Sequence, residues 1–211
     1  MPTTPLPRLV LLASSSRPQR ILTALGARFH SVIAPVDIEI APGESAKAYA
    51  MRVAKRMAST PLRPDDLLLA SFSIVVVDCE VLTRPTDPAD AQRMLTLLQG
   101  RDHIVWTALA LARHNPARDT TATESVTVTL GAMSSDEIDW YLSTGEPLEE
   151  VGAYSPQGSG SIFVSAISGN YTTLLGSPLP TIRRLFGELD LDFRDYLDPS
   201  RQPGLTDTHI L

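Results

Sequence analysis

Short apolar runs alternate with polar, turn-forming segments along this chain. The runs at 8–13 and 67–77 consist almost entirely of apolar side chains, which is typical of buried strands, and the second is interrupted only by Ser71 and Ser73. Further runs with strand character follow in the second half of the chain. We predict strands at 8–13, 29–34, 67–77, 103–112, 123–130 and 162–167.

Residues that favour helix starts stand between these runs. Ser45 is a predicted N-cap, Asp87 followed by Pro88 is a strong helix start, and Ser134 with Glu137 has the spacing of a capping box. We predict helices at 19–25, 45–58, 87–100, 134–142 and 180–189. Because strands interleave with helices but several strands are adjacent in sequence, we expect an α/β fold with a mixed rather than a purely parallel sheet.

Composition fits one globular domain. The chain has 211 residues, 43% of them hydrophobic and 20% charged, and no run approaches the length of about 18 apolar residues that a membrane span needs. Its net charge of −6 argues against a nucleic-acid polymer or an anionic membrane as partner, but leaves a small anionic ligand open. Cys79 is the only cysteine, which excludes an intramolecular disulfide and a cysteine-based zinc site. We expect a cytoplasmic protein without a signal peptide.

The first candidate site follows the first predicted strand. Ser14, Ser15 and Ser16 precede a helix, and free N–H groups at a helix N-terminus favour an anion. Ser16 could equally serve as a helix cap, and one residue can do both. The segment therefore predicts a phosphate site or a cap.

Two further segments carry weaker signals. The loop 152–160 contains several glycines, which allow close backbone approach, and Gln157, which suits a base edge or a sugar. Arg84 follows a predicted hairpin at Asp78 and could bind a phosphate, although a lone arginine is more often only solvated. The histidines are scattered, and we interpret His103 as structural rather than as a metal ligand.

Four motifs occur in a fixed order over nearly the whole chain. They are GRDHIVWT at 100–107, GEPL at 145–148, GAY at 152–154 followed by QG at 157–158, and GSPLP at 176–180. In sequence and spacing they resemble the Maf family, the septum-formation-inhibitor-like nucleoside triphosphate pyrophosphatases. The resemblance covers about residues 9–189.

This resemblance implies a mixed β-sheet flanked by helices, with two lobes around a deep cleft that takes a nucleoside triphosphate. In the family, a divalent cation, Mg²⁺ or Mn²⁺, assists attack of water on the α–β phosphoanhydride, which gives a monophosphate and pyrophosphate. Such chemistry needs carboxylates to bind metal or activate water, and cations to offset phosphate charge.

The chain departs from the family pattern at carboxylate and lysine positions. The family's Gly-Ala-Asp-Thr aligns with 70–73, so that Phe72 stands in the place of the essential aspartate. Ile40 stands at an expected glutamate and Met57 at an expected lysine. Phenylalanine neither binds Mg²⁺ nor accepts a proton, and loss of a general base alone costs about 10²–10⁴-fold in rate.

Phosphate-binding cations are changed as well. Another family lysine falls on Glu150 or Val151, and a pair of arginines falls on Pro18 and Gln19. The lysine of a Lys-Pro signature is replaced by Arg84, which keeps the charge.

Three hypotheses follow from this pattern. The leading one is a Maf-like domain, at 8–190, with degraded or absent pyrophosphatase activity and residual nucleotide binding. An active pyrophosphatase with relocated carboxylates such as Glu39 is an alternative, and a non-catalytic regulatory or dimerisation module, with a possible homodimer, is another. The predicted substrate-binding residues are Ser14, Ser16, Arg20, Ser73, Arg84 and Gln157. We assign no catalytic residue and no metal ligand, and we expect residues 191–211 to form an acidic, partly flexible tail.

Overall fold

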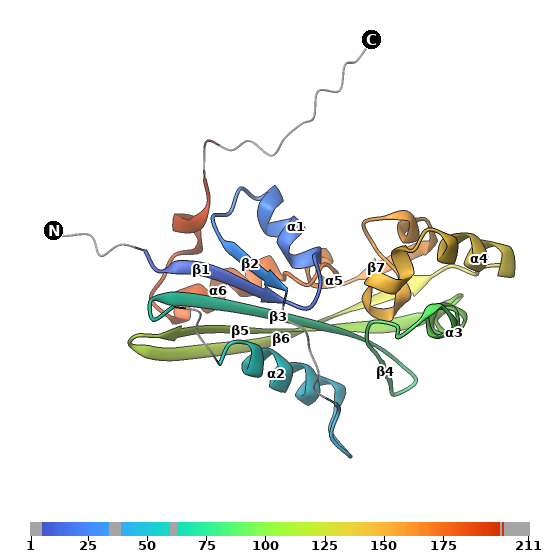
Figure 1. Ribbon diagram of the computed structural model, residues 1–211, viewed down its shortest axis with the longest axis horizontal. Coiled ribbons are helices and arrows are strands. Elements are labelled where there is room, and N and C mark those ends of the chain that lie inside the picture. Colours follow the sequence, from blue (N-terminus) through green and yellow to red (C-terminus); the bar gives the residue numbers. More distant parts are fainter. Residues whose placement is uncertain (1–5, 34–38, 60–62, 199, 201–211) are drawn as a thin grey trace, which may run out of the picture.

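The computed structural model describes residues 6–33, 39–59, 63–198 and 200, and these form one mixed sheet flanked by helices (Figure 1). The seven strands are β1 (Arg8–Ala13), β2 (His30–Ile33), β3 (Asp66–Val77), β4 (Glu80–Leu82), β5 (Asp102–His114), β6 (Ala117–Leu130) and β7 (Val164–Ser168). Their order is β2-β1-β3-β5-β6-β7, with β4 paired to β3. Strand β1 is parallel to β2 and β3, whereas the other pairings are antiparallel. The predicted mixed α/β fold is confirmed.

Five of the six described α-helices begin within two residues of the predicted starts, and the sixth, a short helix after β7, was not predicted. The α-helices are α1 (Arg17–Ala24), α2 (Ala46–Met57), α3 (Pro88–Leu98), α4 (Ser135–Ser143), α5 (Tyr171–Leu174) and α6 (Leu179–Glu188). Ser45 accepts from Ala48 N at the start of α2, and Asp87 accepts from Asp90 N at the start of α3. The capping box of Ser134 is formed as predicted. Short 3₁₀ helices η1 (Glu146–Glu149), η2 (Val151–Ala153), η3 (Ser159–Phe163) and η4 (Phe193–Tyr196) were not predicted.

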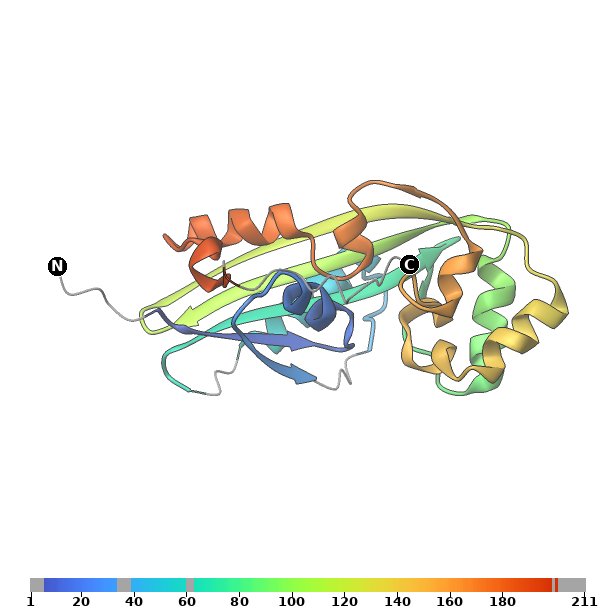
Figure 2. The same cartoon turned by 90° about the horizontal axis from the view of Figure 1, so that it is seen from above.

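The core is divided into clusters on the two faces and at one end of the sheet. One cluster joins the inner side of α2 to β1, β3 and β5, and a second packs α6, α1 and η4 against the opposite face. A third lies at the far end of the long strands, between α3, α4 and the 3₁₀ helices. Figure 2 shows this arrangement: β3, β5 and β6 run from the end of the sheet covered by α2 and α6 to the end covered by α3 and α4. The chain thus has two packed lobes that share three strands.

Alternation along β3 assigns its side chains to opposite faces. Phe72 belongs to the cluster under α2, together with Ala70 and Ile74. Ser71 and Ser73 point to the other face, where they bond to the segment that contains α5 and to β5. A residue at position 72 and a residue at position 73 therefore serve different sides of the sheet.

Two sequence predictions need correction. The predicted strand 162–167 begins as the 3₁₀ helix η3, and the strand itself is Val164–Ser168. The predicted flexible tail is wrong for its first part, because Phe193 and Tyr196 are buried against α6 and their rings contact Phe186. Residues 199 and 201–211 lie outside the described part of the chain, as does Ala34 at the end of the predicted strand 29–34. No helix among the described residues is long and apolar enough to cross a membrane.

Candidate nucleotide site

The turn between β1 and α1 leaves Ser14 and Ser16 partly accessible, whereas Ser15 is buried. Ser16 occupies the N-cap position of α1, but its side chain makes no capping hydrogen bond, so the capping interpretation is not supported. Its backbone carbonyl accepts from Arg20 N at 3.1 Å and starts the helix. Ser14 and Ser16 are half-buried and Arg20 is exposed. The hydroxyls therefore stand beside a helix N-terminus without closing it, a setting that favours an anion.

Arg17, the first residue of α1, turns inward and forms a buried ion pair with Glu150. Its Nε atom lies 3.0 Å from Glu150 Oε2, and the two side chains are 4% and 6% exposed. That carboxylate oxygen makes no hydrogen bond, so the contact is ionic. Burial raises the pKa of Glu150, against the lowering effect of Arg17 and Arg20. The resemblance implies a lysine at Glu150 or at the next position, Val151, and at Glu150 a negative charge stands instead, faced by the positive charge of Arg17.

Phe72 lies in an apolar setting on the α2 side of β3. The ring is 4% exposed and meets Tyr49 of α2 edge-on, with centroids 5.7 Å apart and planes at 86°. On the adjacent strand, Trp106 packs against the same cluster and lies under the ammonium group of Lys47, 5.8 Å from the ring centroid. The neighbourhood of position 72 is therefore aromatic and cationic.

Ser73 is placed differently from the other predicted binding residues. Its hydroxyl is buried and hydrogen-bonds with Thr107 Oγ1 at 2.8 Å, and Thr107 donates in turn to the carbonyl of Thr173 at 2.9 Å. The Ser71 hydroxyl likewise donates to the carbonyl of Gly176. These hydroxyls join β3 and β5 to the segment around α5. A ligand role for Ser73 stays a prediction.

The segment that carries Arg84 lies beside the loop 152–160, a proximity that the sequence does not reveal. Gly152 N donates to the carbonyl of Thr83 at 3.0 Å, which ties the loop to the segment that carries Arg84. Arg84 lies 3.3 Å from Glu149 in an exposed ion pair, and Gln157 is exposed. Both side chains are accessible to a ligand.

A polar network that sequence reasoning missed supports this loop. Glu146 accepts from the hydroxyl of Tyr141 at 2.8 Å and from the backbone N–H groups of Ser159 and Gly160. The Tyr141 oxygen also accepts from Ser155 N at 2.9 Å. The motif GEPL contains Glu146, but nothing in the sequence reveals that its carboxylate folds over a loop more than ten residues away.

His103 is structural, as predicted. It is 2% exposed, and its Nε2 atom hydrogen-bonds with the hydroxyl of Tyr154 at 2.8 Å. Burial lowers the pKa of His103 to about 4, with Asp102 opposing the shift. The neutral imidazole therefore fixes Tyr154 of the GAY motif beneath the loop.

The donor atoms around Phe72 do not fit a divalent cation. Phe72 offers no oxygen ligand, and no group of three or more His, Cys, Asp or Glu side chains suited to a metal occurs within the described ranges. Other carboxylates near β3 that could replace the missing one already form ion pairs: Asp78 pairs with Arg101, and Glu80 lies 2.6 Å from Arg93 on the surface. Glu39 is exposed, and Asp37 lies outside the described residues. We therefore derive no step that passes through a metal ion.

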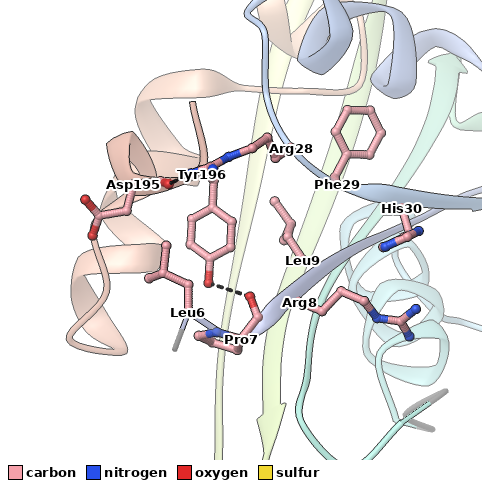
Figure 3. A pocket seen from close by; sticks show the side chains of 9 residues that line it. All are labelled: Leu6, Pro7, Arg8, Leu9, Arg28, Phe29, His30, Asp195 and Tyr196. Atoms are coloured by element: carbon pink, nitrogen blue, oxygen red, sulfur yellow. Dashed lines mark hydrogen bonds between the residues drawn. The ribbon is translucent and has the colours of Figure 1, made fainter. Parts of the chain in front are cut away.

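A cavity near the start of β1 lies away from these residues. It has a volume of about 380 Å³ and is lined by residues of β1, β2 and η4 (Figure 3). Its polar groups already bond within the protein, since Tyr196 donates to the carbonyl of Pro7 at 3.1 Å and Arg28 donates to the carbonyl of Asp195 at 2.6 Å. None of the predicted binding residues lines this cavity.

Comparisons with known proteins agree on one group. Residues 8–189 match the family described as Maf-like protein. A protein of Anaeromyxobacter dehalogenans named dTTP/UTP pyrophosphatase is 40% identical over 175 residues, which cover 82% of this chain and 89% of that protein. Proteins of the same name are 40% identical over 174 residues in Salmonella typhimurium (81% and 87% covered) and 38% identical over 190 residues in Shewanella denitrificans (85% and 95% covered).

Proposed function

This chain belongs to the Maf family, and from that membership we propose that it binds a pyrimidine nucleoside triphosphate while its own pyrophosphatase activity is strongly reduced. The nature of the ligand rests on the relatives, which are named dTTP/UTP pyrophosphatases. The proposed reduction of activity rests on the side chains of this chain alone.

The ligand-binding part of the proposal uses the turn at α1 and the loop 152–160. Ser14 and Ser16 lie beside the N-terminus of α1, where N–H groups and the helix dipole favour phosphate. Arg84 adds an exposed cation, and Gln157 an exposed amide that can both donate and accept. The triphosphate is thus assigned to the serines and Arg84, and the nucleoside to the side of Gln157.

The observation that carries the proposed loss of activity is the packing of Phe72 on Tyr49. Hydrolysis between the α and β phosphates requires a water molecule to lose a proton as it attacks phosphorus, and pyrophosphate to leave with its charge compensated. Phe72 supplies neither a base nor a ligand, and its near-complete burial leaves no room for a water molecule to replace the missing carboxylate there.

The ion pair between Arg17 and Glu150 supports the same proposal. A carboxylate of the protein already compensates the charge of Arg17, so this guanidinium has little charge left for a phosphate. Glu150 also repels an incoming polyphosphate as long as it is ionised. We therefore expect weaker triphosphate binding than a lysine at this position would give.

The test compares this protein with the Salmonella typhimurium relative in the same assay. Purified proteins are incubated with dTTP or UTP and with Mg²⁺ or Mn²⁺, and monophosphate and pyrophosphate are separated by chromatography. We expect a thermal shift with dTTP or UTP but product release at least about 10²-fold below that of the relative. Equal rates in the two proteins would overturn the proposal.

Variants at position 72 refine this test. Phe72→Asp should gain product release, whereas the apolar control Phe72→Leu should not. Because an aspartate at this buried position destabilises the fold, circular dichroism melts accompany both assays. Rates that equal those of the relative and are abolished by Glu39→Gln would instead favour an active enzyme with a relocated carboxylate.

A further inference from the structure

Strand β7 forms an open edge of the sheet. It pairs with β6 along one side only, and the sheet order ends there. All residues from 165 to 171 are exposed. Figure 2 shows the orange segment that contains β7 at the margin of the sheet, beyond β6. The outward N–H and C=O groups of β7 are thus a template for another β-strand.

This edge lacks charged residues and prolines, two of the features that normally protect edge strands, although a bulge shifts its register with β6 beside Leu130. Sheet edges are usually blunted by charged side chains, prolines or bulges that prevent pairing with another chain. The segment 151–182 contains no Asp, Glu, Lys, Arg or His, although the chain has 24 acidic and 18 basic residues elsewhere. Strand β7 itself, with the sequence VSAIS, lies in the middle of this charge-free segment.

Apolar side chains extend the edge on both sides. Ile162 precedes β7 and is 67% exposed, and Tyr171 follows it and is 47% exposed. Trp140 of α4 is 48% exposed, and its ring lies 6.4 Å from that of Phe163. Ile167, within β7, is also exposed. The open edge is therefore bordered by large apolar groups and uncharged polar ones rather than by charged ones.

We propose that β7 pairs antiparallel with β7 of a second copy of this chain, around a two-fold axis at Ala166. Val164 then lies opposite Ser168, and Ser165 lies opposite Ile167. The two sheets become one continuous sheet through the dimer.

Charge and symmetry single out a second copy as the partner. A two-fold axis brings each residue near its own counterpart, so a charged edge strand would repel itself. The charge-free β7 meets no such repulsion, and the small side chain at Ala166 lets the two strands approach at the axis. In a protein of net charge −6, this segment is a surface on which two copies meet without opposing charges.

The opposite edge of the sheet, strand β2, provides a control for the proposed pairing at β7. Strand β2 is the other terminal strand, and its Ile33 is 60% exposed. Pairing of β2 with β7 of a neighbour would be heterologous and would extend into an open fibre, whereas β7 with β7 closes at two chains. The two edges therefore predict different assemblies.

Sedimentation velocity from micromolar to near-millimolar concentration tests the proposal. We expect a monomer–dimer equilibrium for the unmodified protein, a monomer for Ala166→Lys, and an unchanged equilibrium for Ile33→Lys. Unchanged thermal melting verifies that Ala166→Lys is folded. A monomer at every concentration, dimerisation that survives Ala166→Lys, or dimerisation lost in Ile33→Lys would each overturn the proposal.

Cross-linking provides a second measurement that does not require the dimer to be broken. The native Cys79 is exposed, so the test uses Cys79→Ser as background. Ala166→Cys in this background should give a disulfide-linked dimer on oxidation, whereas Ile33→Cys should not. Equal cross-linking of the two variants would contradict pairing at β7. Neither measurement depends on nucleotide binding or turnover.

Discussion

The guanidinium of Arg17 lies 3.0 Å from the carboxylate of Glu150, and both side chains are almost completely buried. The pair joins Arg17 in the first turn of α1 to Glu150 between η1 and η2, 133 residues further along the chain. Arg17 also donates to the carbonyl of Leu174 at 3.4 Å. One buried cation thus holds together three segments around the proposed nucleotide site.

Removal of the charge of Glu150 should destabilise the protein strongly. Glu150→Gln leaves Arg17 buried without a counter-ion, and loss of one partner of a buried pair costs about 3–5 kcal/mol. Urea unfolding at pH 7 measures the change in the free energy of unfolding. The control Glu149→Gln removes the neighbouring exposed carboxylate and should change that free energy by no more than about 1 kcal/mol. Similar losses in the two variants would show that the buried pair contributes little.

The burial of His103 should make the protein less stable in mild acid. Its pKa is about 4 in the folded protein, below the ordinary value of 6.5. The unfolded chain therefore binds more protons in this window, and the stability contributed by neutral His103 is present above pH 6.5 and is lost as the pH falls towards 4. The expected loss is at most about 3 kcal/mol.

Urea unfolding between pH 7 and pH 4.5 measures this effect in the native protein and in His103→Gln. Carboxylates titrate in both proteins, so the informative quantity is the difference between their slopes. The variant should lose less stability on acidification. Parallel curves for the two proteins would contradict the assignment to His103.

Replacement of Gly152 should cost more than replacement of an unconstrained glycine. Gly152 has φ 71°, and an added Cβ would lie 2.7 Å from a methyl group of Val75. Gly43 has φ 75° but meets nothing within 4 Å. Both alanine variants suffer the left-handed backbone strain of about 1–2 kcal/mol, and only Gly152→Ala adds an overpacking cost of about 1–3 kcal/mol. Thermal unfolding of the two variants measures the loss of stability. Equal losses would argue against a tight contact of the loop with β3.

Trp106 should report on a bound nucleotide. Its ring lies on the Phe72 side of the sheet, under the ammonium group of Lys47, and Ile74 is its partner on β3. A nucleotide that extends from the serines to position 72 contacts this ring or draws Lys47 away from it, and either change alters the tryptophan emission. We expect dTTP to alter the tryptophan fluorescence of Trp140→Phe and to leave that of Trp106→Phe nearly unchanged. A fluorescence change in Trp106→Phe but not in Trp140→Phe would instead indicate that the ligand binds near Trp140 of α4.

Local sequence signals predicted the frame of the protein because each acts within a few residues. The cap at Ser45, the start at Asp87 and the capping box at Ser134 all form, and the turn at Asp78 and Cys79 adopts positive φ angles that close the β3–β4 hairpin. The possible cap at Ser16 does not form: the residue occupies the N-cap position of α1, but its hydroxyl makes no capping hydrogen bond, which the sequence could not show.

The candidate site depends on contacts between distant segments, and these were less predictable. The pairing of Arg17 with Glu150 and the fold of Glu146 over Ser159 have no local signature. Phe72 was noticed only through the family resemblance, because an apolar residue in an apolar strand looks ordinary. The burial of Tyr196 was missed because the composition of the segment suggested a tail, whereas two aromatic side chains anchor it to α6.

The continuity of β5 and β6 limits how the two lobes can move. These strands pair without a register shift from Asp102 to His114, and β3 pairs beside them from Leu67 to Val76, so the ladder crosses from one lobe to the other. A hinge needs a few backbone positions that can change their dihedral angles freely, and three hydrogen-bonded strands provide none. The protein is therefore unable to clamp shut on a ligand as hinged enzymes do. In the proposed nucleotide site, selectivity then comes from a preformed shape rather than from domain closure.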